Sequence, residues 1–246
     1  MSRSTLLSPP GISVRQLRLD LGSHRLFDSL NLEIPAAACT ALLGASGVGK
    51  SSLMRVIAGL TPPTSGQISG SDGLPLAGRI AWMGQQDLLY PWLNVEQNVC
   101  LASRLHGEKP DSDWAHHLLA RVGLTRYATA RPATLSGGMR QRAALARTLY
   151  ARKPIVLMDE PFSALDALTR SQIQTLAAGV LAQHTVLLIT HDAAEACRLS
   201  HHMRVLTGSG IEPCPPLAGQ PPRAPDDAGV MRSQAALLQQ LAKVAL

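Results

Sequence analysis

A glycine-rich loop between a strand-like run and a helix-like run constrains this chain more than any other feature. The short apolar run Cys39–Leu43 is followed by Gly44-Ala-Ser-Gly-Val-Gly49-Lys50-Ser51, which satisfies the pattern G-x-x-x-x-G-K-[ST]. Glycines let successive backbone N–H groups curl around a polyphosphate, and the positive end of the following helix points at the same anion. The pattern therefore predicts a strand, a phosphate-binding loop and a helix that together hold a nucleotide.

Two side chains of this loop are expected to bind different parts of the nucleotide–metal complex. Lys50 is expected to reach the β- and γ-phosphates, and the Ser51 hydroxyl is expected to help hold Mg²⁺. A glycine-rich turn that matches by chance is the alternative, and the strand-like and helix-like flanks argue against it. The expected nucleotide-binding set is Gly44, Ala45, Ser46, Gly47, Val48, Gly49, Lys50, Ser51 and Ser52.

Strand-like and helix-like segments alternate along the rest of the chain. The run 155–158 is apolar throughout and the run 185–189 is apolar after Thr185, as is typical of parallel strands buried on both faces. Helical patterns occupy about 138–151 and 168–182, and each is followed by one of these strand-like runs. We therefore expect an α/β fold with a mostly parallel sheet that helices cover on both sides.

Further segments are expected to add antiparallel strands, a helical lobe and a C-terminal extension to this sheet core. Alternating apolar and polar residues over 12–34 predict two or three antiparallel strands, and irregular then helical patterns predict an inserted helical lobe at about 86–150. We expect one domain over 1–212 and a proline-rich linker with a short helix over 213–246. The smaller segments are a glycine-rich turn at 66–78, a short strand at 79–83, the linker at 213–225 and an amphipathic tail helix at 233–246.

Charge and hydropathy leave several partners open. The formal net charge of +6 fits nucleotide phosphates, an anionic membrane surface or nucleic acid, although aromatic residues at 3% offer few side chains for stacking on bases. The chain has no apolar stretch near the roughly 18 residues of a membrane span. Its four cysteines are far apart and form no C-x-x-C pair, which favours reduced thiols in a cytosolic protein.

Two carboxylates follow the apolar run 155–158. The carboxyl ends of parallel strands are where ligands bind, so Asp159 is placed to hold Mg²⁺ and Glu160 to polarise an attacking water. Beside Pro161 the pair could also be an ordinary turn, and the phosphate loop upstream favours the catalytic interpretation.

A second sharp motif is Leu135-Ser136-Gly137-Gly138-Met-Arg-Gln-Arg142. Ser136 is a good helix cap, and the two glycines leave backbone N–H groups open to an anion. This motif is similar to the signature of ATP-binding cassette (ABC) ATPases. The order of the other motifs is similar too: the phosphate loop, Gln85 after a short strand, IVLMDEP, Ser163-Ala-Leu-Asp166 and Ile189-Thr-His191-Asp192.

The resemblance covers about residues 12–207 and implies a P-loop NTPase of the ABC type, with a mostly parallel sheet core, an antiparallel β subdomain and an inserted α-helical lobe. It implies ATP and Mg²⁺ as cofactors, ATP hydrolysis, and two cassettes paired head to tail. In such a pair Ser136, Gly137 and Gly138 contact the γ-phosphate bound by the partner, and Asp166 joins the two sites.

The same resemblance implies the catalytic roles. Glu160 resembles the general base, Asp159 the metal-side carboxylate and His191 the switch histidine on the γ-phosphate. Gln85 resembles the glutamine that links metal, water and membrane partner, so the expected metal-site residues are Ser51, Gln85 and Asp159. The sequence departs from the family at Leu21, where an aromatic side chain usually stacks on adenine and only Phe27 is nearby, and at Gly84, where an aromatic usually precedes the glutamine.

Within the family, the segments 85–99 and 159–170 look like those of bacterial importer ATPases of the nitrate, sulfonate and taurine group, with thiamine or hydroxymethylpyrimidine importers as close competitors. This resemblance implies a separate transmembrane permease pair that binds residues 86–105, a solute-binding protein, and a peripheral place on the cytoplasmic face of the bacterial inner membrane. A soluble ABC-type ATPase that acts on nucleic acid or in iron–sulfur cluster assembly is the alternative. Nucleic acid is not the expected partner, because the chain has one cassette and no heptad run.

Overall fold

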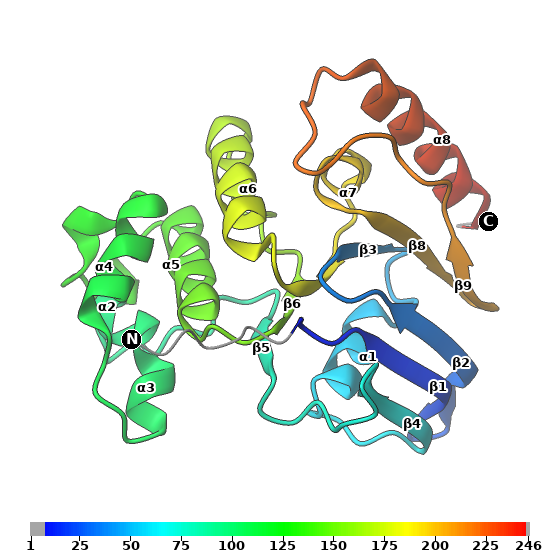
Figure 1. Ribbon diagram of the computed structural model, residues 1–246, viewed down its shortest axis with the longest axis horizontal. Coiled ribbons are helices and arrows are strands. Elements are labelled where there is room, and N and C mark those ends of the chain that lie inside the picture. Colours follow the sequence, from blue (N-terminus) through cyan, green and yellow to red (C-terminus); the bar gives the residue numbers. More distant parts are fainter. Residues whose placement is uncertain (1–7, 245–246) are drawn as a thin grey trace.

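Two β-sheets and a helical lobe make up residues 8–244, which are the residues that the computed structural model describes (Figure 1). The smaller sheet is antiparallel, in the order β2-β1-β4, and confirms the antiparallel strands expected over 12–34. The expectation of a turn from residue 66 was wrong at its start, because this segment pairs with β1 from Ile12↔Gly70 to Arg18↔Ser65. The strands are β1 (Ile12–Leu21), β2 (His24–Ile34) and β4 (Ser65–Gly70).

The larger sheet forms the core of the molecule. Its order is β5-β6-β7-β3-β8-β9, and every neighbouring pair is parallel except β8 with β9. Parallel strands need long crossovers, and helices supply them here. The strands are β3 (Cys39–Leu43), β5 (Ile80–Met83), β6 (Ile155–Asp159), β7 (Thr185–Ile189), β8 (His202–Thr207) and β9 (Gly210–Pro213).

Both faces of this sheet are buried. Odd-numbered residues of β6 and β7, such as Leu157 and Leu187, pack with α1 (Lys50–Ile57) and the antiparallel sheet. Even-numbered residues, such as Met158 and Leu188, pack on the other side with α5 (Gly137–Tyr150) and α6 (Ala167–Leu181). The side chains of a strand point alternately to the two faces of the sheet. A run of consecutive apolar residues therefore correctly predicted strands that are covered on both faces.

The helical lobe lies beside the sheet core, on the opposite side of Figure 1 from β1, β2 and β4. Polar side chains start its helices: Asn94 caps α2 with a reciprocal bond from Gln97, Asp111 caps α4, and Ser136 caps α5. The lobe contains α2 (Val95–Val99), α3 (Leu101–Leu105), α4 (Ser112–Arg121), the 3₁₀ turns η1 (Thr125–Tyr127) and η2 (Pro132–Thr134), and α5.

The C-terminal segment packs on the core. After α7 (Ala193–Leu199), β8 and β9, an extended strap leads to α8 (Ala228–Val244), whose Leu237 is buried in the same cluster as Leu43 of β3. The tail helix begins earlier than residue 233 because the Asp227 carboxylate accepts the N–H groups of Gly229 and Val230. The division of the chain at 213 stays a prediction, and residues 1–7 and 245–246 of the expected units lie outside the described residues.

Within residues 8–244, no helix combines the length and apolar character that crossing a membrane requires.

Candidate active site

The carboxyl ends of three strands of the larger sheet meet at one cleft. The loop from β3 to α1 forms one wall, and the ends of β6 and β7 form the other. The cleft has a volume of about 240 Å³ and is lined by Ser46, Gly47, Gly49, Lys50, Ser51, Ser52, Asp159, Glu160 and Ile189. The fold thus brings the predicted phosphate loop and the predicted carboxylate pair together.

The backbone of the phosphate loop requires glycine at its turns. Gly47 and Gly49 have φ of +80° and +104°, which side-chain-bearing L-residues rarely adopt, and a Cβ on Gly49 would lie 2.8 Å from the Phe27 ring. Lys50 begins α1, and its ammonium donates hydrogen bonds of 2.9 Å to the carbonyls of Gly44 and Ala45. The lysine is therefore drawn across the concave side of the loop, where its charge faces an incoming phosphate.

The charged groups of the cleft perturb one another. Burial lowers the pKa of Lys50, while the negative charges of Glu160 and Asp159 act in the opposite direction. Burial raises the pKa of Asp159, and a hydrogen bond from Ser51 counteracts part of this effect. The hydroxyl of Ser51 and the carboxylate of Asp159 are therefore neighbouring oxygen donors, the ligand chemistry that Mg²⁺ prefers, so these residues fit the ion.

Glu160 and His191 face each other across the ends of β6 and β7. His191 Nδ1 lies 3.1 Å from Glu160 Oε1, and the histidine side chain is 67% exposed whereas the carboxylate side chain is 21% exposed. The Glu160 backbone has a φ of +49°, in the left-handed region, and its N–H donates to the carbonyl of Ile189. Two strands and an uncommon backbone conformation thus fix the position of this carboxylate.

Gln85 lies at the same edge of the sheet but apart from the carboxylates. It follows β5 by two residues, and the pairing Met83↔Met158 places it beside the end of β6. Its side chain is exposed, and among residues 8–244 it makes no hydrogen bond to Asp159 or Glu160. The structure therefore places Gln85 near the site without joining it to the cleft.

The signature residues lie on the helical lobe. The Ser136 hydroxyl caps α5 by accepting the Met139 N–H at 3.3 Å, and neither Ser136, Gly137 nor Gly138 lines the phosphate cleft of its own chain. Asp166 caps α6 by accepting the Thr169 N–H at 3.0 Å, and hydrogen bonds from Thr169 lower its pKa. These predicted nucleotide-contacting residues are thus separate from the loop that holds the phosphates.

Gln141 is a site residue that the sequence prediction missed. It is buried on α5, where its amide nitrogen donates to the Glu160 carbonyl at 3.0 Å and its amide oxygen accepts the Ala164 N–H at 2.8 Å. The signature helix therefore holds the loop that follows Glu160. The available signal was the spacing of Gln141, which lies three and four residues before Ala144 and Leu145 and so shares their apolar helix face, where a polar side chain requires hydrogen-bond partners.

The structure also shows the two side chains of the β1–β2 hairpin that were considered for contact with adenine. Phe27 is 5% exposed and packs against Gly49, so its ring supports the phosphate loop from below and offers no open face for stacking. Leu21, at the end of β1, is 48% exposed. The nearby ring therefore does not replace the missing aromatic, and Leu21 is the exposed apolar side chain of this hairpin.

Comparisons with known proteins identify the family of this chain. The model of the ABC transporter family matches residues 27–163. An uncharacterized ABC transporter ATP-binding protein of Haemophilus influenzae is 40% identical over 94% of this chain and 98% of its own length. Aliphatic sulfonates import ATP-binding proteins named SsuB are similar as well: that of Granulibacter bethesdensis is 41% identical over 89% of both chains, and SsuB 2 of Paracoccus denitrificans is 40% identical over 96% of this chain and 94% of its own.

Solved structures agree with the sequence comparison. The dimeric post-hydrolysis state of an ATP-binding cassette bound to ADP and Pi superimposes with a TM-score of 0.73 at 27% identity, over 87% of this chain and 99% of that one. The ATP-binding subunit of an ABC transporter has a TM-score of 0.77 at 24% identity, over 96% of this chain and 99% of that one, and so shares the fold. The predicted fold class and enzyme class are confirmed: the chain belongs to the ABC transporter family and is an ATP-binding, ATP-hydrolysing subunit.

Proposed function

We propose that this chain is the ATPase subunit of a bacterial importer whose cargo is an aliphatic sulfonate. The paired-subunit part of this proposal is carried by the separation of the phosphate cleft from the signature residues Ser136–Gly138, which lie on different lobes of one chain. Two chains paired head to tail would bring the signature of each to the phosphate loop of the other. The dimeric cassette bound to ADP and Pi and the relatives named as sulfonate importers support this assembly and this cargo.

Within each half-site the residues would divide the reaction. Lys50 and the N–H groups of residues 44–49 hold the ATP phosphates, and Glu160 positions the attacking water and accepts its proton. Before ATP binds, His191, whose Nδ1 lies 3.1 Å from Glu160 Oε1, orients the Glu160 carboxylate. Once ATP is bound, His191 contacts the γ-phosphate. Ser51, Asp159 and Gln85 would hold Mg²⁺, which when bound supplies positive charge to the phosphates, and the exposed Gln85 side chain would have to turn toward the cleft to reach the ion.

The signature residues and Asp166 act from the other subunit. Ser136 and the free N–H groups at the start of α5 would donate to the γ-phosphate bound by the partner, where the positive end of the helix favours an anion. A side chain added at Gly137 would meet no atom nearer than 3.9 Å, so the approach to this helix end is open. Asp166, exposed at the start of α6, would join the two sites.

A separate permease would bind the surface formed by residues 86–105. Trp92 is 65% exposed and packs edge-on against Tyr90, with ring centroids 5.1 Å apart, and Leu88 beside them is 49% exposed. Exposed aromatic side chains in a cluster are typical of protein contacts. The chain would lie peripherally on the cytoplasmic face of the inner membrane and would receive cargo indirectly from a solute-binding protein.

Growth of the source bacterium tests the proposal. A strain that lacks this gene is expected to lose growth on an alkanesulfonate as sole sulfur source and to keep growth on sulfate, and the wild-type gene, but not Glu160→Gln, is expected to restore it. Parallel cultures on taurine, on nitrate and without thiamine test the other cargoes that the sequence leaves open. Undiminished growth of the deletion strain on alkanesulfonates would refute the sulfonate assignment, and normal growth in every culture would favour a soluble role.

A further inference from the structure

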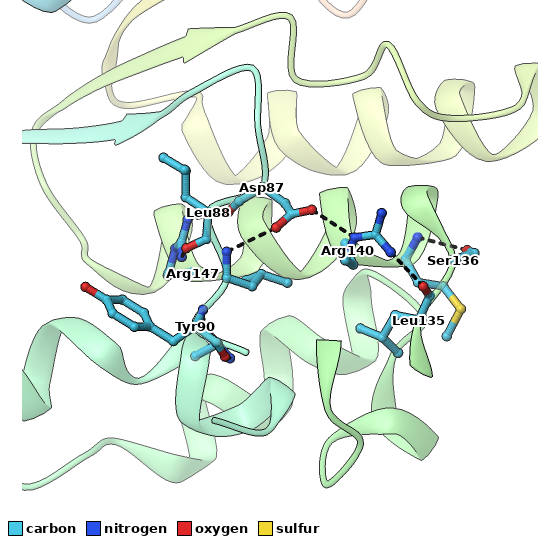
Figure 2. A network of polar contacts seen from close by, with 10 residues as sticks. Asp87, Leu88, Tyr90, Leu135, Ser136, Arg140 and Arg147 are labelled. Atoms are coloured by element: carbon cyan, nitrogen blue, oxygen red, sulfur yellow. Dashed lines mark hydrogen bonds and ion pairs between the residues drawn. The ribbon is translucent and has the colours of Figure 1, made fainter. Parts of the chain in front are cut away.

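The loop that follows Gln85 is tied to the signature helix by a polar network (Figure 2). Arg140 Nε donates to Asp87 Oδ2 at 2.9 Å, and its Nη1 donates to the carbonyl of Leu135 at 2.9 Å. Arg147 donates to the carbonyls of Asp87 and Leu88 at 2.7 and 2.6 Å. One carboxylate and two arginines therefore connect the two segments directly.

The two arginines hold the loop at separate points along one helix face. Arg140 and Arg147 lie on α5 at positions that are about two helical turns, or about 10 Å, apart and so share a face. Both reach residues 87–88, whose carboxylate also accepts the Leu89 N–H at 3.1 Å. A loop held at two points cannot rotate on the helix as it could on one.

The next residues of the loop are fixed to the same lobe. The buried side chain of Asn98 on α2 accepts the Tyr90 N–H at 2.7 Å and donates to the carbonyls of Tyr90, Leu93 and Asn94. By contrast, no side-chain hydrogen bond to Gln85 or Gln86 occurs among the described residues. The loop is therefore part of the helical lobe from Asp87 onward, and only residues 84–86 separate it from β5.

The network also reaches the signature itself. Arg140 contacts the carbonyl of Leu135, the residue before Ser136, while its other side holds Asp87. A displacement of Asp87 therefore pulls on the first turn of α5, whose N–H groups face the partner's nucleotide in the assembly proposed above. Arg140 therefore links the loop, which carries exposed apolar side chains, to the signature.

We propose that Asp87, Arg140 and Arg147 are positioning residues that hold the signature Ser136-Gly137-Gly138 in place for the partner's γ-phosphate, and that they do so through the loop that follows Gln85. This inference rests on the head-to-tail assembly in the proposed function. It assigns to these three side chains a role in closing the dimer and none in binding ATP within one chain, because they do not line the phosphate cleft.

The test compares Asp87→Ala, Arg140→Ala, the double variant and Arg147→Ala. Each is prepared with Glu160→Gln to measure ATP-dependent dimerisation by size exclusion, and without it to measure kcat. Asp72→Ala is the matched control, because Asp72 and Arg79 form an ion pair of similar exposure, 2.6 Å long against 2.9 Å for Asp87 and Arg140, on the antiparallel-sheet side of the molecule. The Kd of the single chain for ATP is measured for every protein.

Each network variant is expected to lose about three- to tenfold in kcat and in dimer formation, while its Kd for ATP changes less than about twofold. The loss in the double variant is expected to be smaller than the product of the two single losses, because both changes break the Asp87–Arg140 contact and each also removes one separate bond, to Leu89 or to Leu135. Asp72→Ala is expected to match the wild type. Where an alanine variant does not fold, Asp87→Asn or Arg140→Lys replaces it.

Dimer formation and kcat equal to those of the control would overturn this inference, and so would losses in the two single variants that multiply in the double variant. If the Glu160→Gln reference itself forms no dimer with ATP, the proposed assembly has failed. If the reference dimerises normally and the network variants match it, only the inference about these positioning residues has failed.

Discussion

Glu195 on α7 is a buried carboxylate whose charge the fold tolerates poorly. Glu195 is 5% exposed, and its carboxylate accepts a hydrogen bond from Gln174 at 3.1 Å. Burial, with a smaller contribution from Asp192, raises its pKa from 4.5 to about 7, although hydrogen bonds from Thr190 and Gln174 and the charge of Arg170 act in the opposite direction. We predict that Glu195→Gln, which keeps the shape and removes the charge, makes the protein less sensitive to pH.

The size of the effect follows from the change in pKa. A pKa raised from 4.5 to about 7 corresponds to about 3 kcal/mol of unfolding free energy. The unfolded chain releases this proton first, so the contribution is complete below pH 4.5 and is lost as the pH rises through about 7. Between pH 5 and pH 8 the wild type is expected to lose about 2.5 kcal/mol that the variant keeps.

Urea unfolding of both proteins at pH 5, 6, 7 and 8 measures this difference. Comparing wild type with variant at each pH cancels the titration of all other groups. Glu108→Gln, at an exposed position before α4, is the control and is expected to differ from the wild type by less than about 0.5 kcal/mol at every pH. A wild-type-minus-Glu195→Gln difference that stays constant from pH 5 to pH 8 would refute the reasoning.

Two further predictions concern the cleft and the permease surface. Gly49→Ala is expected to weaken ATP binding at least about tenfold and to lower stability by about 1–2 kcal/mol, because φ is +104° and the new Cβ would meet Phe27. Fluorescent-nucleotide titration checks this, and an unchanged Kd would contradict it. Trp92→Ala is expected to leave the ATPase rate of the isolated chain within about twofold, since the side chain is exposed, but to reduce co-purification with the permease. Full retention of the permease would remove Trp92 from that contact.

Much of the core could be predicted because its signals are local. Residues 155–159 and 185–189 are buried at every position, which matches their apolar runs, and the alternation in residues 12–34 matches two antiparallel strands. The phosphate loop also follows from local chemistry, since three of its glycines have positive φ. The signature and carboxylate motifs gave the family because their order along the chain is itself a pattern.

The remaining features depend on contacts between distant residues. Strand β4 has the sequence SGQISG, which carries little strand signal, and it exists because its backbone pairs with β1. The Asp87–Arg140 contact joins residues 53 positions apart, and nothing in either local sequence specifies the partner. Phe27 could not be assigned from sequence either, because its burial under Gly49 follows from the packing of β2 against the phosphate loop.

The most direct test of the central claim compares wild type with Glu160→Gln by ATP turnover and by size exclusion with and without Mg-ATP. We predict that wild type hydrolyses ATP and elutes as a monomer, whereas Glu160→Gln binds ATP, loses about 10²–10⁴ in rate and elutes as a dimer only with ATP. Unchanged turnover in Glu160→Gln would remove Glu160 from catalysis. Tight ATP binding by Glu160→Gln without any dimer would contradict the shared site itself.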